Sequence, residues 1–291
     1  MRVLAVDVGG TKLAAGRYDG QLDDVVRVPT GADPWADLTA LLDPLAEDVD
    51  AVGVACGGPM AWPAGVVAPL NIPAWRHGFP LRDRLAERYG LPVRLHNDAA
   101  CVAVAEHAHG GWGTDDLLGM VVSTGVGGGL VLGGKLVDGA TGNAGHIGHL
   151  VVDPAGPECG CGGRGCLEAV ARGPALVSWA AERGCPATDG VELAGLARRG
   201  DPLALQAFAR AGRALGVAIA SAVALLDVRV VAVGGGLAQV PSLWPTLRRT
   251  VAEHGRLAYF EGLQVEPARL GQTAGLVGAA SLFDDRYWSG G

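Results

Sequence analysis

The 291-residue sequence has few features of a protein that binds nucleic acid or a membrane. Only two of its 23 basic residues are lysine, no cluster of Lys and Arg occurs, and the net charge of −7 opposes binding to a polyanion. It has no run of eighteen uninterrupted apolar residues, and the N-terminal segment lacks the small-residue cleavage site of a secretory signal. We therefore expect a cytoplasmic protein with no nucleic-acid partner and no membrane partner.

Aromatic residues are also scarce, at 5%, but 49% of the residues are apolar and 18% are charged. This composition is sufficient to bury one large core or two medium ones. Six cysteines are present, and three of them crowd into residues 159–166 while the others are scattered. The crowding favours metal ligands in a reducing compartment over a disulfide framework.

Strand and helix patterns alternate along the chain, which is typical of the α/β class. Strands are predicted at 2–8, 13–18, 50–56, 92–96, 117–139 (two strands around a turn) and 228–233, and helices at 34–47, 80–89, 98–107, 167–183, 201–226 and 273–284. The opening strand, glycine turn and strand recur about 115 residues later, which indicates two related halves. We predict a small lobe, residues 1–110 joined by the C-terminal segment 273–291, and a larger lobe, residues 111–272.

Three glycine turns directly follow predicted strands. Glycines lack a Cβ, so a phosphate can approach their backbone N–H groups. One such turn is also compatible with an ordinary hairpin, but three suit the phosphates and nucleoside of one nucleotide. The predicted nucleotide-binding residues, with Asp7 as a candidate for holding Mg²⁺ through water, are Asp7, Gly9, Gly10, Thr11, Lys12, Thr124, Gly125, Gly234, Gly235 and Gly236.

Asp98 follows Asn97 at a strand-to-helix junction, where a helix N-terminus favours a carboxylate. An aspartate at such a junction usually serves as a simple N-cap. It is also chemically sufficient as the base that orients and deprotonates an acceptor hydroxyl in phosphoryl transfer. The position is compatible with both roles.

One imidazole and three thiols, from His149, Cys159, Cys161 and Cys166, match the ligand set of a closed tetrahedral zinc site. Sites of this composition are usually structural. Glu168 lies two residues after the last cysteine, so an ordered metal loop would also fix its carboxylate. That carboxylate is suited to accept hydrogen bonds from sugar hydroxyls, although a solvated glutamate in a first helical turn explains it equally well.

Together these segments resemble the ROK family of sugar kinases. The resemblance spans nearly the whole chain and is carried by DVGGTK at 7–12, HNDA at 96–99, STGVGGG at 123–129, the cysteine-rich segment 144–173 and VGGG at 233–236. It implies a two-lobed actin/hexokinase-like (ribonuclease H-like) fold with the active site in the interlobe cleft. It also implies a homodimer or homotetramer.

The family resemblance assigns roles to individual residues. It implies that the glycine turns bind ATP with Mg²⁺ and that Asp98 is the base acting on a sugar 6-hydroxyl. It further implies that Asn97, His149 and Glu168 contact the sugar, so that His149 serves both the sugar and structural zinc. The expected activity is transfer from ATP to a hexose or an N-acetylhexosamine.

Position 146 departs from the glucose-phosphorylating members, which usually carry a glutamate where this chain has His146. Bacterial N-acetylmannosamine kinases of the family also have AGHIGH, so His146 slightly favours a substrate of that type and is counted among the sugar-binding residues. A glucokinase, or a kinase of an amino sugar such as kanosamine, is the alternative. A sugar-responsive regulator is less expected, because ROK repressors carry an N-terminal helix-turn-helix and the first strand here begins by residue 3.

Overall fold

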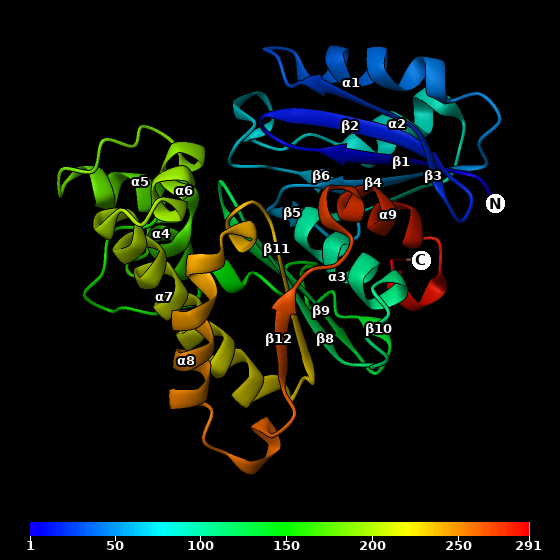
Figure 1. Cartoon of the computed structure of the whole chain (residues 1–291). Helices are drawn as coiled ribbons and strands as arrows, with labels where there is room; N and C mark the ends of the chain where they lie inside the picture. The colour runs from blue at the N-terminus through cyan, green and yellow to red at the C-terminus, as the bar shows by residue number, and fades with distance from the viewer. Residues whose placement is uncertain (291) are drawn as a thin grey trace. The chain divides into compact units, whose positions relative to one another are not determined.

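The structure is a computed structural model that describes residues 1–290, and its order of elements confirms the predicted α/β class (Figure 1). By internal contacts the chain forms two units. The first contains residues 1–115, 129–145 and the segment from Leu270 onward, and the second contains residues 116–128 and 146–269. The two lobes predicted from the sequence, with a boundary near residue 110, remain a prediction about which parts of the chain fold or move as separate domains.

The first unit is built on a five-stranded sheet in the order β3-β2-β1-β4-β7. Antiparallel pairs join the first three strands, while β4 and β7 run parallel to β1. The parallel strands end at one edge, which brings the ends of β1 and β7 together. The strands are β1 Val3–Val8, β2 Lys12–Tyr18, β3 Leu22–Pro29, β4 Ala51–Cys56 and β7 Val93–Asn97, and a separate short pair is β5 Met60–Ala61 with β6 Val66–Val67.

Helices cover both faces of this sheet (Figure 1). Alternate residues of β1 point to opposite sides, since side chains in a strand have a period of two. Leu4 and Val6 pack in the core below α1 and α2, whereas Val3 and Ala5 pack with Leu276 of α9. The helices are α1 Pro34–Leu42, α2 Leu81–Tyr89, α3 Asp98–His109 and α9 Ala274–Ser281.

The second unit contains strands of another five-stranded sheet, ordered β10-β9-β8-β11-β12. β11 is parallel to both β8 and β12, and β10 is antiparallel to β9. By internal contacts, β10 and the part of β9 from Gly129 onward belong to the first unit. The strands are β8 Leu117–Val122, β9 Val126–Leu132, β10 Lys135–Leu136, β11 Val230–Gly234 and β12 Gln264–Pro267.

The long helix α7 is the centre of the helical layer in the second unit. Its N-terminus is capped by Asp201, which accepts hydrogen bonds from the N–H groups of Leu203 (3.0 Å) and Ala204 (2.9 Å). It packs against every other helix of that unit. These helices are α4 Leu167–Ala171, α5 Gly173–Ala181, α6 Gly190–Arg198, α7 Pro202–Leu226 and α8 Trp244–His254.

By length and composition alone, α7 is apolar enough to cross a membrane. However, 56% of its most apolar window is buried inside the protein. Residues such as Phe208, Leu215 and Ile219 are fully buried on the face that meets its neighbouring helices. This burial is the pattern of a helix in a protein core.

The structure corrects three helix lengths expected from the sequence. The helix predicted at 34–47 ends at Leu42 and is followed by a 3₁₀ turn, Asp43–Leu45, because Pro44 has no N–H to continue the helical bonding. The helix predicted at 167–183 is two helices, separated where Arg172 is extended before Gly173 and Pro174. The final helix ends at Ser281.

Candidate functional site

In the first unit, Asp7 lies in β1 just before the turn formed by Gly9 and Gly10. The turn is closed by a hydrogen bond from the Gly9 N–H to the Lys12 carbonyl (3.1 Å), and the Thr30 hydroxyl donates to the Gly9 carbonyl (2.7 Å). Thr11 and Lys12 are exposed at the start of β2. Hydrogen bonds therefore fix the backbone of the turn, while Thr11 and Lys12 remain exposed to solvent.

Asp7 lies in an environment that opposes its negative charge. Burial, and then the nearby charge of Asp98, raises the pKa of Asp7 from 3.8 to about 6, although Lys12 and Arg27 pull it down. The ends of β1 and β7 lie at the same edge of the sheet with β4 between them, and two carboxyl groups there repel each other unless a cation lies between or beside them. The pair is thus suited to a divalent cation, whose preferred ligands are hard oxygens and water.

Asn97 and Asp98 occupy the junction between β7 and α3. Asn97 is the N-cap: its Oδ1 accepts hydrogen bonds from the N–H groups of Ala99 (3.0 Å) and Ala100 (3.4 Å). Asp98 is the first helical residue, partly buried, and its Oδ1 accepts from the Ala99 N–H at 2.8 Å. With its oxygen turned to the helix, the Asn97 amide keeps its NH₂ group for a ligand.

One residue near the first glycine turn had not been expected from the sequence. A Cβ on Gly10 would collide with the side chain and carbonyl of Asn71, a residue of the loop between β6 and α2. This close approach explains why position 10 needs glycine. The only sequence signal for Asn71 was an isolated polar residue among apolar residues and prolines, which is too weak to indicate a site.

In the second unit, Glu168 is bound directly to the second glycine turn. Its Oε2 accepts a hydrogen bond from the Val126 N–H (3.0 Å), and a Cβ on Gly125 would come to 3.0 Å from the same oxygen. The Gly173 N–H also donates to the Ser123 carbonyl (2.8 Å). The turn at Thr124 and Gly125 is therefore held by the segment that follows the cysteines.

The third glycine turn lies against the second. β11 ends at Gly234, and Gly235 has a φ of +89°, a conformation that favours glycine. A side chain there would overlap the Val122 backbone at the end of β8. Because β8 and β11 are parallel neighbours, the turns at 123–125 and 234–236 meet at one edge of the sheet.

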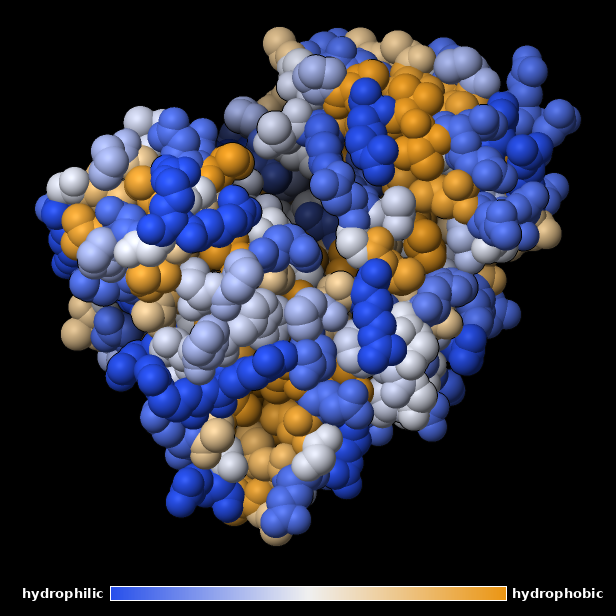
Figure 2. Space-filling model, in the orientation of Figure 1, coloured by the Kyte–Doolittle hydropathy of each residue, from blue (hydrophilic) through white to orange (hydrophobic). Residues whose placement is uncertain are grey.

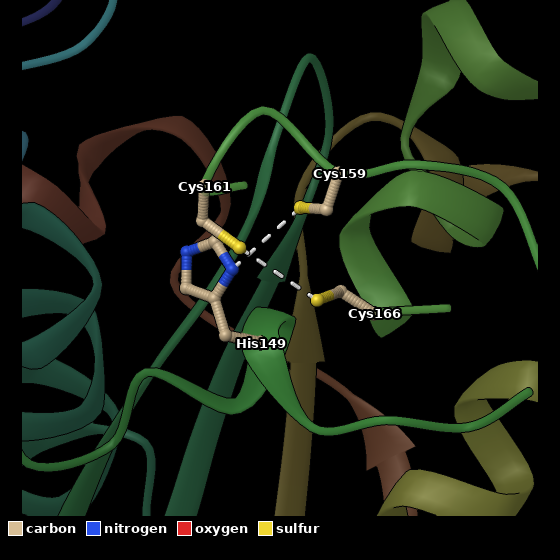
Figure 3. Close-up of side chains that lie close together, drawn as sticks. All are labelled: His149, Cys159, Cys161 and Cys166. Carbon is tan, nitrogen blue, oxygen red and sulfur yellow. Dashed lines mark hydrogen bonds between the residues drawn. The ribbon is translucent and has the colours of Figure 1, made fainter. Parts of the chain in front are cut away.

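Four side chains form a candidate metal centre (Figure 3). The ligand atoms of His149, Cys159, Cys161 and Cys166 all lie within 4.8 Å of one another. His149 Nδ1 is 3.8 Å from Cys159 Sγ, and Cys161 Sγ is 3.8 Å from Cys166 Sγ. Zn–S bonds of about 2.3 Å in a tetrahedron place sulfurs roughly 3.8 Å apart, so the set fits a four-coordinate cation.

The loop that carries the cysteines is ordered by its own backbone. The Cys159 N–H donates to the Gly163 carbonyl (2.8 Å), and the Gly162 N–H donates to the Cys159 carbonyl (2.9 Å). Burial and the two neighbouring cysteines raise the pKa of Cys166 to about 12. A bound cation would reverse this effect and keep the thiols deprotonated.

His146 precedes the 3₁₀ turn Ile147–His149, and its carbonyl accepts a hydrogen bond from the His149 N–H (3.0 Å). The two imidazole rings are nearly parallel, with centroids 6.2 Å apart. His149 directs Nδ1 toward the cysteines, so Nε2 is the nitrogen left for another partner (Figure 3). His146 and the candidate metal ligand His149 thus lie in one short segment.

The residues predicted from the sequence divide between the two units. The first unit contains Asp7, Gly9, Gly10, Thr11, Lys12, Asn97 and Asp98, and the second contains Thr124, Gly125, His146, His149, Cys159, Cys161, Cys166, Glu168 and Gly234–Gly236. Within each unit the structure brings members of the set together.

A pocket of about 600 Å³ in the second unit includes none of these residues. It lies between α8 and β12, where apolar side chains line a hollow that Figure 2 shows in orange. Its apolar lining includes Val251, Leu257, Phe260, Leu263 and Val265, and Arg248 and Glu266 pair at its rim (2.6 Å). No motif in the sequence indicates this pocket.

The fold and these clusters define an α/β protein whose strand-terminal glycine turns lie beside acidic side chains and a Cys₃His cluster. The ROK family model matches residues 3–286. The chain belongs to the ROK family, as its motifs predict.

Individual relatives agree over nearly the full length. An N-acetylmannosamine kinase from Shigella flexneri is 37% identical over 291 residues, covering 97% of this chain and 98% of the relative. A ROK family glucokinase from Streptomyces griseus, solved with glucose and AMPPNP, is 34% identical with a TM-score of 0.86, covering 97% and 99%. A ROK hexokinase from Thermus thermophilus is 40% identical with a TM-score of 0.83, covering 97% of each chain. The actin/hexokinase-like fold class is confirmed by these matches.

Removal of one thiol tests the metal centre. Cys161 is exposed, so Cys161→Ser leaves packing intact while removing one ligand. We expect about one metal ion per chain in the unmodified protein and loss of most of it in the variant after dialysis against a chelator, measured by elemental analysis. Cys185→Ala is the matched control outside the cluster, and equal metal content in both variants would contradict the assignment.

The pKa of Asp7 predicts a dependence of stability on pH. The folded protein keeps a proton on Asp7 up to about pH 6, whereas the unfolded chain releases it near pH 3.8, so the unfolding free energy falls as the pH rises through this range. Asp7→Asn should abolish that fall. In urea titrations without added Mg²⁺, we expect the variant to be more stable at pH 7, by up to about 3 kcal/mol, and equal near pH 4.

The exposed Asp19 supplies the control for this measurement, as Asp19→Asn should leave the pH profile unchanged. A variant Asp7→Asn that is less stable than the unmodified protein at pH 7 would show that the Asp7 charge is favourable in the folded state.

Proposed function

We propose that the chain is an ATP-dependent sugar kinase that transfers the γ-phosphoryl group to the 6-hydroxyl of a hexose or an N-acetylhexosamine. The observation that carries the proposal is the pairing of Asp98 at a helix N-terminus with the raised pKa of Asp7. Two acidic groups at the same edge of one sheet, with the first of them beside a glycine turn, suit an acceptor hydroxyl and a cation-bound phosphate. Sugar kinases among the full-length relatives support the same reaction.

In this proposal Asp98 accepts the proton of the sugar hydroxyl as the bond to phosphorus forms. The helix N-terminus and the Ala99 N–H stabilise its ionised form, which is the form able to accept a proton. Asp7 would hold Mg²⁺ through water, and Mg²⁺ would offset negative charge on the phosphates. Gly9, Gly10, Thr11 and Lys12 offer donors to those phosphates.

The sugar would be recognised by hydrogen bonds with Asn97, Glu168 and His149. The Asn97 amide donates, while the carboxylate of Glu168 accepts hydrogen bonds from hydroxyl groups. Only one oxygen of Glu168 is bound to Val126, at 3.0 Å, so its other oxygen is suited to a hydroxyl. His149 would contact the sugar through Nε2 while Nδ1 faces the metal.

The nucleoside would be bound by the glycine turns of the second unit, at Thr124, Gly125 and Gly234–Gly236. These turns lie together at the ends of two parallel strands, a position where α/β sheets commonly bind ligands. Zinc is the cation that we assign to the Cys₃His cluster, in a structural role, because three thiolates and one imidazole complete its tetrahedral shell. A homodimer or homotetramer stays a prediction.

Replacing the proposed base tests the reaction. Asp98→Asn retains the shape and the acceptor for the Ala99 N–H but cannot take a proton. We expect kcat to fall by about 10²–10⁴-fold in a coupled ADP-release assay, with sugar binding retained in calorimetry. Asp83→Asn changes another first-turn aspartate, which is 58% exposed, and serves as the control. Near-normal turnover by a folded Asp98→Asn protein would exclude the base.

The substrate preference is tested at position 146. A carboxylate accepts hydrogen bonds at several lone pairs, whereas a neutral imidazole has one acceptor and one donor, so His146 suits a substituent other than a free hydroxyl. We propose N-acetylmannosamine-type sugars as the preferred class. His146→Glu should raise the kcat/KM ratio of glucose to N-acetylmannosamine by about tenfold or more.

The panel for this test also contains N-acetylglucosamine and kanosamine, and His254→Glu in the exposed last turn of α8 is the control. An unchanged ranking of the four sugars in His146→Glu would remove His146 as the residue that sets the preference. A ranking led by glucose in the unmodified protein would favour the glucokinase alternative.

A further inference from the structure

The first unit contains a buried histidine to which the proposed reaction assigns no role. His96 is the penultimate residue of β7, pairs in register with Ala55 of β4, and has 1% of its surface exposed. Its Nε2 lies 2.9 Å from Oδ1 of Asp138, a residue of the loop that follows β10. Its Nδ1 accepts a hydrogen bond from the backbone N–H of Asn97 at 2.8 Å. Both ring nitrogens are therefore engaged.

These two bonds define the tautomer of His96. A nitrogen that accepts from an N–H group cannot itself carry a proton, so Nδ1 is bare and the proton of the neutral ring is on Nε2. Nε2–H then donates to the Asp138 carboxylate. The carboxylate does not form an ion pair with an imidazolium; it holds a neutral imidazole in one orientation.

Asp138 is itself held from the other side. The Ser289 hydroxyl donates to its Oδ2, and its backbone carbonyl accepts from the Ala144 N–H at 3.0 Å. Burial alone would raise the pKa of Asp138, but the hydrogen bonds from His96 and Ser289 outweigh it and keep the pKa below its usual value. Asp138 is thus an ionised acceptor for the Nε2–H group.

The chain of bonds leads to the residue proposed as the base. The peptide that His96 holds is the one from which Asn97 projects, and the Asn97 Oδ1 caps the helix that begins at Asp98. The side chains of Asn97 and Asp98 both accept from the same Ala99 N–H, at 3.0 and 2.8 Å. A rotation of the His96–Asn97 peptide would move the cap and the Asp98 carboxylate together.

We propose that His96 and Asp138 are a positioning pair for Asp98: the carboxylate of Asp138 fixes the Nε2–H tautomer of His96, and bare Nδ1 fixes the peptide that aims Asp98. The inference rests on the proposed kinase function, because it is Asp98 as base that the pair orients. Neither residue touches the substrate. Their effect is on the geometry of proton acceptance, to which displacements of 1 Å can matter about 10²-fold in rate.

A purely structural role for a buried histidine is the competing explanation. Trp62 packs on the His96 ring, with centroids 4.9 Å apart, and Trp288 packs on Trp62 at 4.7 Å. Loss of that packing would lower stability without singling out kcat. The test variants must therefore keep the ring or the size of the side chain and separate turnover from folding.

Two single variants and their double variant make the test. His96→Phe keeps an aromatic ring against Trp62 and removes both hydrogen bonds. Asp138→Asn keeps the size of the side chain, but its NH₂ can donate to Nε2 and shift the ring proton to Nδ1, which then no longer accepts from Asn97. We expect each to lower kcat by about 10–100-fold with the KM for ATP within about twofold. The double variant should be no slower than the slower single one.

His109→Phe is the matched control, because it makes the same replacement at the last residue of α3, where the histidine Nε2 lies 3.1 Å from the Ser281 Oγ and has no bond to Asp138 or Asn97. We expect its kcat within about threefold of the unmodified protein. Thermal unfolding is measured for all variants, and rates are compared well below each midpoint. A kcat within threefold in folded His96→Phe or Asp138→Asn would overturn the proposal, as would losses of kcat that follow only the loss of stability.

A second readout does not depend on activity. The ¹⁵N resonances of labelled histidine distinguish a bare from a protonated ring nitrogen. His96→Phe identifies the signal, which should show bare Nδ1 in the unmodified protein and a protonated Nδ1 fraction in Asp138→Asn. A protonated Nδ1 in the unmodified protein would contradict the assigned tautomer.

The activity of Asp98→Asn separates the kinase proposal from the positioning pair. If Asp98→Asn turns over normally, the base and the kinase mechanism proposed here are wrong, whatever His96 does. If Asp98→Asn is inactive but His96→Phe and Asp138→Asn are not impaired, the kinase proposal stands and only the positioning pair is lost.

Discussion

The hydrogen bond between the Glu168 carboxylate and the Val126 N–H is the contact that connects the glycine turn of the second unit to its cysteine loop. It joins the glycine turn at 123–125 to the segment that carries the last candidate metal ligand, Cys166, two residues before Glu168. A Cβ on Gly125 would come to 3.0 Å from the carboxylate oxygen, so a larger residue there would have to displace the Glu168 side chain. An ordered cysteine loop would therefore also fix the glycine turn at 123–125, which the proposed reaction uses to bind the nucleotide.

In the first unit the main constraint is an unfavourable interaction, the repulsion between the carboxyl groups of Asp7 and Asp98. Asp7 and Asp98 are brought near each other by the parallel pairing of β1, β4 and β7, and burial raises the pKa of Asp7. Such an arrangement lowers the stability of the folded protein unless a cation binds. Perturbed carboxyl groups of this kind gather at functional sites, where fold stability is given up for binding and catalysis.

The sequence predicted those parts of the site that depend on local composition. The three cysteines are two to seven residues apart and so lie in one loop, and glycines that follow apolar strands indicate close backbone approach, so the Cys₃His cluster and the turns could be predicted. The pairing of His96 with Asp138 was not, since 42 residues separate them and each is an ordinary polar residue in its own segment. Helix ends at Leu42 and Ala171 were missed because the prolines that follow act through a missing N–H that periodicity does not register.

The backbone around His146 is fixed by its neighbours, which bears on sugar specificity. The His146 carbonyl accepts a hydrogen bond from the N–H of His149, whose Nδ1 faces the cysteine cluster, so the backbone at residue 146 is held by a candidate metal ligand three residues away. A side chain on so fixed a backbone has few orientations available to it, and its hydrogen-bonding character therefore matters more than its reach. In the proposed reaction, an imidazole in place of a carboxylate at this position would change which sugar substituents can be hydrogen-bonded, while the backbone and Asp98 stay in place.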